Sequence, residues 1–240
     1  MTDGELAAQL ATQAGKMLLA LQTTGSGKEL GEEGDRIANG FLCAAIRKAR
    51  PDDALLSEEE IDCTSRCAVS RVWIVDPLDG TREYSEGRGD WAVHVGLAID
   101  GVPAAGAVAL PAMGLTLCSE TPLALPPANQ TLKIAISRTR PAAEAVALAK
   151  TLSAELLPMG SAGAKAMAVV RGEADIYLHT GGQYEWDNCA PVAVAQAAGL
   201  HCSRIDGSPM QYNNANPYLP DLLICRTELA EQVLALVKPL

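Results

Sequence analysis

Apolar positions recur with helical spacing through the first fifty residues of the chain. They follow Thr2-Asp3-Gly4-Glu5, which has the form of a capping box, and predict an amphipathic helix over residues 4–22. The apolar positions on its buried face are Leu6, Leu10, Met17, Leu18 and Leu21. A second apolar set predicts a helix over residues 35–49, which Pro51 ends because proline cannot continue a helix.

The pattern then changes to short apolar runs that are typical of strands. These cover residues 54–57, 72–75, 91–99 and 102–110, and Asp100-Gly101 predicts an antiparallel hairpin between the last two. Beyond the proline-rich residues 122–127 the two patterns alternate, which predicts strands over 132–136, 176–179 and near 201, and helices over 141–155, 161–171, 187–198 and from 227.

This order of elements predicts an α/β protein with a layered α+β arrangement. The change of pattern near residues 120–130 divides it into an N-terminal α+β half, residues 1–125, and a C-terminal α/β half, residues 126–240.

The composition is that of an ordinary globular protein, and the charge narrows the range of partners. The chain has 240 residues, 48% of them hydrophobic, and a formal net charge of −10. Nucleic acids and anionic membranes attract basic surfaces, and the sequence has no run rich in lysine and arginine, so we expect neither as a partner. A small anionic substrate would need local cations, which a bound divalent metal can supply.

Other features of the sequence bear on its location. The seven cysteines are scattered, without C-x-x-C pairs or the histidine spacing of a zinc site, so we expect reduced side chains. The acidic N-terminal segment lacks the basic region of a signal peptide, and no apolar run reaches the length of a membrane span. Together these features predict a cytoplasmic protein.

The strongest chemical signal is the hexapeptide Asp76-Pro77-Leu78-Asp79-Gly80-Thr81, which follows the apolar run 72–75. Ligand sites of α/β proteins favour the carboxyl ends of strands. The proline and the glycine shape a turn in which both carboxylates and the Leu78 carbonyl can converge, and such hard oxygen ligands suit Mg²⁺. The amides of Gly80 and Thr81, at the start of a short helix, would then face a phosphate.

Two further acidic segments gain meaning beside this hexapeptide. Glu58 follows the predicted strand 54–57, and Asp187 begins a predicted helix. Each feature taken alone has a purely structural interpretation. Glu58 would belong to an exposed acidic run, Asp187 would be a helix N-cap, and Asp76 and Asp79 would only shape the turn that ends a strand. The combination favours one shared metal site.

Three segments in this order resemble a known superfamily over nearly the whole chain. They are Leu56-Ser57-Glu58-Glu59, Trp73 through Thr81, and Glu185-Trp186-Asp187. They resemble the lithium-sensitive, magnesium-dependent phosphatases that include inositol monophosphatases, fructose-1,6-bisphosphatases and 3′(2′),5′-bisphosphate nucleotidases. The resemblance implies the αβαβα sandwich of these enzymes, hydrolysis of a phosphate monoester by metal-activated water, and a homodimer as a family-level expectation.

The resemblance also implies the metal ligands. Glu58, Asp76 and the Leu78 carbonyl would hold one Mg²⁺, and Asp76, Asp79 and Asp187 would hold a second. Glu58 would also face a third, more weakly bound ion. In the same way Asp35 and Thr81 are implied as the catalytic pair that activates water.

Two segments of the C-terminal half are candidates for binding the rest of the substrate. Residues 137–140 (Ser-Arg-Thr-Arg) end a predicted strand, and residues 160–165 (Gly-Ser-Ala-Gly-Ala-Lys) open a predicted helix, which provides hydroxyls, amides and three positive charges. A capped helix start and an exposed arginine pair are the structural alternatives. Both segments resemble the substrate motifs of CysQ-type bisphosphate nucleotidases, which implies substrate contacts by Ser137, Arg140, Gly160 and Lys165. With the remaining hydroxyls, amides and charges of these segments and of the metal site, the predicted substrate-binding residues are Gly80, Thr81, Ser137, Arg138, Arg140, Gly160, Ser161, Lys165 and Asp187.

This second resemblance favours 3′-phosphoadenosine 5′-phosphate, and with it 3′-phosphoadenylyl sulfate, as substrates hydrolysed at the 3′-phosphate in sulfate assimilation. Inositol 1-phosphate and fructose 1,6-bisphosphate remain alternatives, because related enzymes can accept them. A non-catalytic binding protein and a structural calcium site are two further hypotheses. The complete acid set argues against the first, and the lack of a D-x-[DN]-x-[DN]-G loop argues against the second.

Overall fold

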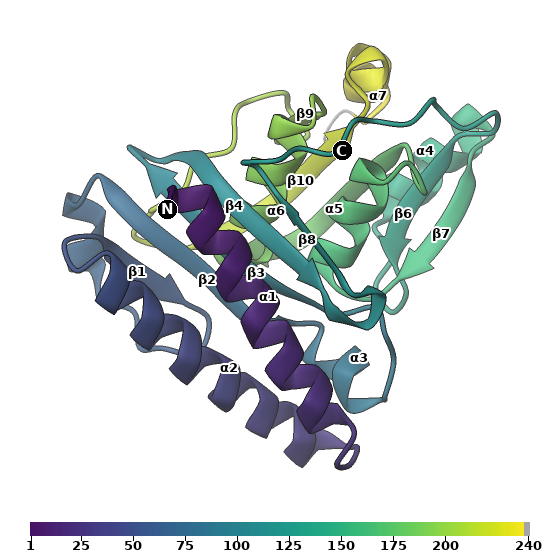
Figure 1. The fold of residues 1–240 in the computed structure, drawn as a ribbon. Helices are drawn as coiled ribbons and strands as arrows, with labels where there is room; N and C mark the ends of the chain where they lie inside the picture. Colours follow the sequence, from purple (N-terminus) through teal and green to yellow (C-terminus); the bar gives the residue numbers. More distant parts are fainter. Residues whose placement is uncertain (238–240) are drawn as a thin grey trace.

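The N-terminal half of the described chain forms a sheet that two long helices cover on one face (Figure 1). The structure, a computed structural model, describes residues 1–237. The elements of this part are α1 (Asp3–Gln22), α2 (Lys28–Ala49), β1 (Ala54–Ser57), a 3₁₀ turn (Thr64–Ala68), β2 (Arg71–Asp79), α3 (Thr81–Ser85), β3 (Ala92–Ile99), β4 (Val102–Leu110), a second 3₁₀ turn (Pro111–Met113) and β5 (Leu115–Cys118). The strand order is β1-β2-β3-β4-β5, in which β1 and β2 are parallel and the other neighbours antiparallel.

The predicted capping box fixes the start of α1. The backbone N–H of Thr2 donates to the Glu5 carboxylate, and the N–H of Glu5 donates to Oγ1 of Thr2. The apolar stripe of α1 then packs on β3 and β4, where Leu6, Leu10 and Leu18 are buried. Removing this stripe from water holds the helix against the sheet.

Helix α2 begins at Lys28, so the predicted start at residue 35 was wrong. Residues 28–34 are rich in acids and glycine and therefore lack the apolar stripe that marks a helix in the sequence. Leu30, Gly31 and Gly34 are nevertheless buried, because the small glycines let α2 approach α3. As a consequence Asp35 lies inside the helix.

The second half of the described chain forms another sheet, whose order is β7-β6-β8-β10-β9. Strands β6, β7 and β8 are parallel, and β10 is antiparallel to both of its neighbours. The elements of this part are β6 (Lys133–Ser137), α4 (Ala143–Leu152), β7 (Glu155–Met159), α5 (Ala162–Val170), β8 (Ile176–Tyr184), α6 (Glu185–Ala197), β9 (His201–Ser203), β10 (Tyr218–Cys225), a 3₁₀ turn (Thr227–Leu229) and α7 (Ala230–Leu236).

The helices and sheets stack in five layers. Helices α1 and α2 form the first layer, α5 and α6 lie between the two sheets, and α4 and α7 cover the far face of the second sheet (Figure 1). This is the αβαβα sandwich that the resemblance to the phosphatase superfamily implies. The first sheet lies before residue 125 and the second after it, while the division into halves at that point stays a prediction.

Three strands escaped prediction, namely β5, β7 and β10. The predicted helix 141–155 is shorter, because α4 ends at Leu152 and Ser153 takes a left-handed φ of 52° before β7 begins at Glu155. Strand β7 lies at the sheet edge, where its side chains are largely accessible and Pro158 is tolerated, so it lacks the apolar run of a buried strand. The predicted helix from residue 227 begins as the 3₁₀ turn and continues as α7; residues 238–240 lie outside the described part.

Helix α6 rests directly on the backbone of the first sheet. A Cβ atom at Gly96 of β3 would lie 2.9 Å from the backbone nitrogen of Ala190, and one at Gly106 of β4 would lie 3.0 Å from the Cα atom of Ala190. Glycine at these two strand positions therefore allows the close approach. The contact brings the amino end of α6, which carries Asp187, to the carboxyl end of β2.

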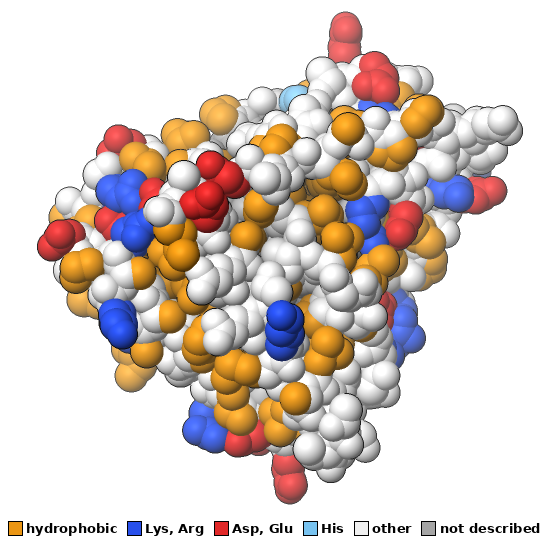
Figure 2. Space-filling view, in the orientation of Figure 1, with side chains coloured by type: hydrophobic (Ala, Val, Ile, Leu, Met, Phe, Trp, Pro, Cys, Tyr) orange, Lys and Arg blue, Asp and Glu red, His pale blue; other side chains and the backbone are white. Residues whose placement is uncertain are grey.

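The surface carries both signs of charge. On the face shown in Figure 2, basic side chains stand as separate groups among acidic and neutral ones. Within residues 1–237, none of the helices has the length and apolar character needed to cross a membrane. All seven cysteines have free thiols, and Cys63 and Cys67 are exposed.

Candidate active site

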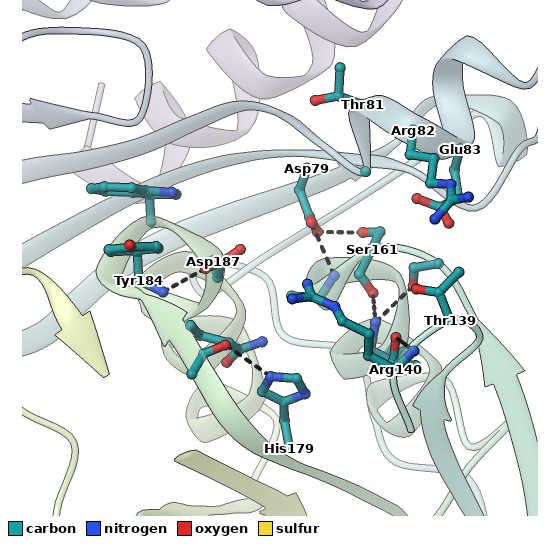
Figure 3. A pocket seen from close by; sticks show the side chains of 18 of the residues that line it. Asp79, Thr81, Arg82, Glu83, Thr139, Arg140, Ser161, His179, Tyr184 and Asp187 are labelled. Carbon is teal, nitrogen blue, oxygen red and sulfur yellow. Dashed lines mark hydrogen bonds between the residues drawn. The ribbon is translucent and has the colours of Figure 1, made fainter. Parts of the chain in front are cut away.

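A cavity of about 620 Å³ opens where β2, α5 and the turn from β8 into α6 meet. Figure 3 shows Asp79 and Asp187 pointing into it from different elements, with Ser161 and Arg140 beside them. Most of the predicted substrate-binding residues line this cavity: Gly80, Thr81, Ser137, Arg140, Gly160, Ser161, Lys165 and Asp187.

The hexapeptide forms the end of β2 and the turn into α3. Its pairing with β3 slips between Asp76 and Asp79, so the residues between them bulge out of the ladder. Proline tolerates such a position because it has no N–H to donate. Oδ1 of Asp76 accepts a hydrogen bond of 3.0 Å from the backbone N–H of Leu78, which folds the bulge back onto the carboxylate.

Three carboxylates converge at this point. Asp76, Asp79 and Asp187 each place one oxygen within 4.8 Å of the others. Burial, together with the neighbouring Glu58 and Asp79, raises the pKa of Asp76 well above its usual range. Burial and Asp79 raise the pKa of Asp187 to about 6. Closely spaced oxygen ligands that repel one another in a desolvated site fit a divalent cation, which would cancel their charge.

Glu58 lies at the edge of this cluster. It lines the same cavity, but its carboxylate is not one of the three that converge. Desolvation and the charge of Asp187 raise its pKa to about 8, while a hydrogen bond with Asp76 opposes the shift. The structure therefore brings Glu58 next to Asp76, with which it was predicted to share one Mg²⁺.

Asp79 differs from the other acids because it caps helix α5. Its carboxylate accepts hydrogen bonds from the hydroxyl of Ser161, from the N–H of Ala162 at 3.1 Å and from the N–H of Gly163 at 2.6 Å. Burial alone would raise the pKa of Asp79, but His94, the Ser161 hydroxyl and the charge of Lys165 lower it to about 2. The Ser161 hydroxyl in turn accepts a hydrogen bond of 2.9 Å from the N–H of Ala164. This confirms the alternative prediction that Ser161 is the N-cap of the helix.

Asp35 and Thr81 lie side by side. Oγ1 of Thr81 is 3.5 Å from Oδ1 of Asp35 and donates to the Leu78 carbonyl at 3.1 Å. Burial, followed by the charge of Glu59, raises the pKa of Asp35 to about 7. The two predicted catalytic residues therefore meet, although one comes from α2 and the other from the start of α3.

Arg138 is the exception among the predicted substrate-binding residues. It does not line the cavity, because its guanidinium donates to Glu83 at 2.8 Å and to Glu86 at 2.9 Å. Arg140, two residues further along, is exposed at the cavity and is held by a hydrogen bond from its N–H to Oγ of Ser137. The resemblance pointed to Arg140, whereas Arg138 was included for its charge alone, and Glu83 and Glu86 hold it away from the cavity.

Lys165 places a buried ammonium group in the cavity wall. Its Nζ donates to the carbonyl of Gly160 at 2.9 Å and to that of Ser161, and lies 5.4 Å from the ring centre of Tyr177. Burial lowers the pKa of Lys165. Its partners are therefore neutral oxygens and an aromatic face.

Sequence reasoning missed several residues of this site. His94, which lies in the apolar run 91–99, is fully buried and has Nε2 3.1 Å from Oδ2 of Asp79. The rings of Tyr184 and Trp186 stack with centres 4.8 Å apart and planes at 6°, and Tyr218 meets Tyr184 edge-on at 5.9 Å. Trp186 adjoins a motif acid, but Tyr218 lies on the unpredicted strand β10 and carries no local signal.

A buried acid also links α6 to the loop after Glu58. Glu185 accepts hydrogen bonds from the backbone N–H groups of Asn213 and Asn214, at 2.7 and 2.8 Å. Arg66 reaches the same two residues and forms an ion pair with Asp62. Through this network the segment that follows Glu58 is held against the segment that contains Asp187.

The layered fold and the acids at the junction of its sheets define a class of phosphatase. The family model described as the inositol monophosphatase family matches residues 4–239, and the chain belongs to this family.

Relatives within and around this family show how far the similarity extends. A protein of Mycobacterium leprae is 47% identical over an alignment of 255 positions, which covers 99% of this chain and 94% of the relative. A protein of Mycobacterium tuberculosis is 49% identical over an alignment of 240 positions, which covers 93% of this chain and 89% of the relative. Both are named 3′-phosphoadenosine 5′-phosphate phosphatase. The crystal structure of CysQ from Bacteroides thetaiotaomicron has the same fold, with a TM-score of 0.82 and 23% identity over 93% of this chain and 97% of that one.

Proposed function

We propose that this chain is a magnesium-dependent phosphomonoesterase that removes the 3′-phosphate of 3′-phosphoadenosine 5′-phosphate. The observation that carries the proposal is the convergence of Asp76, Asp79 and Asp187 in a cavity that also holds cationic side chains. The mycobacterial relatives, at 47% and 49% identity, support the choice of substrate. The same 3′-phosphate occurs in 3′-phosphoadenylyl sulfate, which we include as a second substrate.

The oxygen donors present would hold two or three Mg²⁺ ions. Asp76, Asp79 and Asp187 would be the central ligands, with Glu58 and the Leu78 carbonyl beside them. Bound Mg²⁺ would supply charge neutralisation for the phosphate and the leaving oxygen, and would lower the pKa of an attacking water.

The chain's own residues then handle the proton. Oγ1 of Thr81 lies within reach of both the Leu78 carbonyl and Oδ1 of Asp35. When its single proton turns from the carbonyl to Asp35, the hydroxyl can accept a proton from water at Oγ1 and pass its own proton to Oδ1. A base works best when its pKa is near the operating pH, and Asp35 has a pKa of about 7. His94, the Ser161 hydroxyl and the charge of Lys165 keep the Asp79 carboxylate ionised, and the amides of Ala162 and Gly163 fix its orientation.

Cations in the cavity wall support a substrate with a second phosphate. Arg140 and Lys165 line the cavity on the side of β6 and α5, where a phosphate can find charged donors. Apart from its reacting phosphate, inositol 1-phosphate has only uncharged hydroxyl groups, which do not need cationic partners. This feature favours a nucleoside bisphosphate over inositol 1-phosphate.

Phosphate release from the purified protein with Mg²⁺ tests the proposal. We expect the highest kcat/KM for 3′-phosphoadenosine 5′-phosphate, when it is compared with inositol 1-phosphate and fructose 1,6-bisphosphate. Asp79→Asn and Thr81→Ala should lose most of this activity, whereas Thr81→Ser, which keeps the hydroxyl, should retain it in large part. As a control, Thr23→Ala changes an exposed threonine at the end of α1, outside the cavity. Absence of hydrolysis of all three substrates would refute the proposal.

A further inference from the structure

Aromatic side chains gather on one wall of the cavity. The chain has three tryptophans, five tyrosines and one phenylalanine, and four of these nine side chains line the cavity. They are Tyr177, Tyr184, Trp186 and Tyr218. Tyr184 and Tyr218 remain 44% and 45% exposed, although large aromatic surfaces are normally buried in a chain that has so few of them.

The backbone around these rings sets their arrangement. Tyr184 ends β8 and lies directly opposite Tyr218 at the start of β10. The N–H of Tyr184 donates to Oδ2 of Asp187 at 2.6 Å, which ties the ring to the acid that begins α6. A Cβ at Gly182 would lie 2.5 Å from the ring of Tyr218, so glycine leaves the space that this ring occupies. The strand pairing and the glycine therefore determine where the two tyrosine rings lie.

The position of the wall separates it from the cationic side of the cavity. Figure 3 shows Tyr184 beside Asp187, while Arg140 and Thr139 lie on the opposite side. A ligand whose reacting phosphate lies at the acids can therefore meet aromatic rings in one direction and Arg140 in the other. A flat, uncharged ring system fits the side of the cavity that the aromatic rings form, because such a ring can stack on an aromatic face.

We propose that Tyr184, Trp186 and Tyr218 form the nucleobase subsite of this cavity, with a purine base stacked on the exposed rings. The subsite rests on the proposed function and extends it to the part of the substrate that does not react. It assigns the second phosphate to Arg140 and the base to the aromatic wall. A sugar phosphate without a base would leave the wall unused.

Two substrates that differ only in the base test this subsite. They are 3′-phosphoadenosine 5′-phosphate and methyl riboside 3,5-bisphosphate, which keeps the sugar and both phosphates. In the Mg²⁺-loaded enzyme, Tyr184→Leu should lower kcat/KM about 10- to 100-fold for the nucleotide, mainly through KM, and less than about twofold for the base-free compound. Tyr184→Phe keeps the ring and should behave like the wild type.

A binding measurement adds a readout that does not depend on turnover. Trp73 and Trp91 are fully buried, so the fluorescence change on adding adenosine 5′-monophosphate to the metal-free protein should come from Trp186. We expect quenching in the wild type and a weaker, right-shifted response in Tyr184→Leu. Phe41→Leu, an aromatic replacement on α2 outside the cavity, should change neither the kinetics nor the quenching.

The outcomes separate the subsite from the reaction. An equal loss of kcat/KM for both bisphosphates in Tyr184→Leu would give this residue a structural role and overturn the subsite. Equal kcat/KM of the wild-type enzyme for the two compounds would also overturn it, while the phosphatase function would stand. If neither compound were hydrolysed, the proposed function would fail, and loss of quenching in Tyr184→Leu would still support the subsite.

Discussion

Nε2 of His94 lies 3.1 Å from Oδ2 of Asp79 in a part of the protein that excludes solvent. On the other side of the ring, Nδ1–H donates to the carbonyl oxygen of Trp186 at 3.0 Å. His94 thereby connects the end of β2 to the start of α6, the two segments that carry Asp79 and Asp187. Although burial lowers the pKa of His94, the charge of Asp79 outweighs it and raises that pKa above its usual value.

The space next to His94 makes a glycine indispensable in α5. A Cβ at Gly163 would overlap the His94 ring, so we expect Gly163→Ala to displace either the ring or the start of α5. Overpacking of this kind destabilises by about 1–3 kcal/mol. Because the Gly163 amide also holds Asp79, phosphate release should fall together with the free energy of unfolding measured in denaturant.

Gly40→Ala is the matched control for this change. Gly40 is exposed in α2, and a Cβ there meets nothing within 4 Å. The alanine should stabilise the helix by about 0.5–1 kcal/mol and leave activity unchanged. If Gly163→Ala were as stable and active as the wild type, the contact between His94 and α5 would not have the importance given to it here.

The clustered acids of the site make the stability of the metal-free protein depend on pH. Asp35, Asp187 and Glu58 have pKa values of about 7, about 6 and about 8, above those of the unfolded chain. The folded state therefore binds more protons than the unfolded state between about pH 4 and about pH 8, and its stability falls as pH rises through this range. Asp79 acts in the opposite sense, since its pKa is about 2 and its contribution is lost only at lower pH.

Melting temperatures measured in a chelator and in Mg²⁺ check this expectation. Between about pH 5 and about pH 8 the melting temperature should fall in the chelator, and Mg²⁺ should raise it more at the higher pH, where the carboxylates are ionised. A melting temperature that rises with pH in the chelator, or a Mg²⁺ effect that is independent of pH, would contradict the mutual repulsion of these acids.

Arg140 should distinguish a bisphosphate from a monophosphate. Its guanidinium is exposed at the cavity, so Arg140→Ala should lower kcat/KM for 3′-phosphoadenosine 5′-phosphate by about 10- to 100-fold. Adenosine 3′-monophosphate, which lacks the second phosphate, should show little change. Arg138→Ala provides the comparison. Because Arg138 pairs with Glu83 and Glu86, its removal should lower kcat/KM less than the removal of Arg140. A larger loss at Arg138 would reverse the assignment of the two arginines.

Arg66 should contribute to stability through the network around Glu185. It is buried, pairs with Asp62 and bonds to Asn213 and Asn214. Arg66→Ala should lower the free energy of unfolding by about 1–3 kcal/mol and raise the Mg²⁺ concentration needed for half-maximal activity, because the loop after Glu58 loses its anchor.

The exposed Arg36–Glu33 pair on α2 gives a control for Arg66. Surface ion pairs contribute about 0–1 kcal/mol, so Arg36→Ala should have a small effect on stability and none on the Mg²⁺ requirement. If the two variants behaved alike, the network around Glu185 would contribute no more to stability than an exposed ion pair.

Local signals in the sequence predicted the parts of the site that lie within one segment. The hexapeptide follows an apolar strand, and both its position and its turn follow from neighbouring residues. Helix α1 was predicted for the same reason. Strand β7 was not predicted, because at the edge of a sheet it needs no apolar run. The start of α2 was predicted too late, because glycines and acids replace apolar side chains in its first turns.

The parts that escaped prediction depend on distant residues. Asp79 was expected to bind metal, but its contact with the amides of Ala162 and Gly163 joins segments that are far apart in the sequence. Tyr218 reaches the cavity only because β10 pairs with β8. No periodicity in one segment records such pairings, so they become visible only in the folded chain.

The glycines under α6 bear on how this protein can change over time. Because Gly96 and Gly106 place the helix backbone against the strand backbone at Ala190, the depth at which α6 sits is set by main-chain atoms. A single methyl group added at either glycine would lift the helix and carry Asp187 away from Asp76 and Asp79, so the geometry of the acids restricts substitution at these two strand positions.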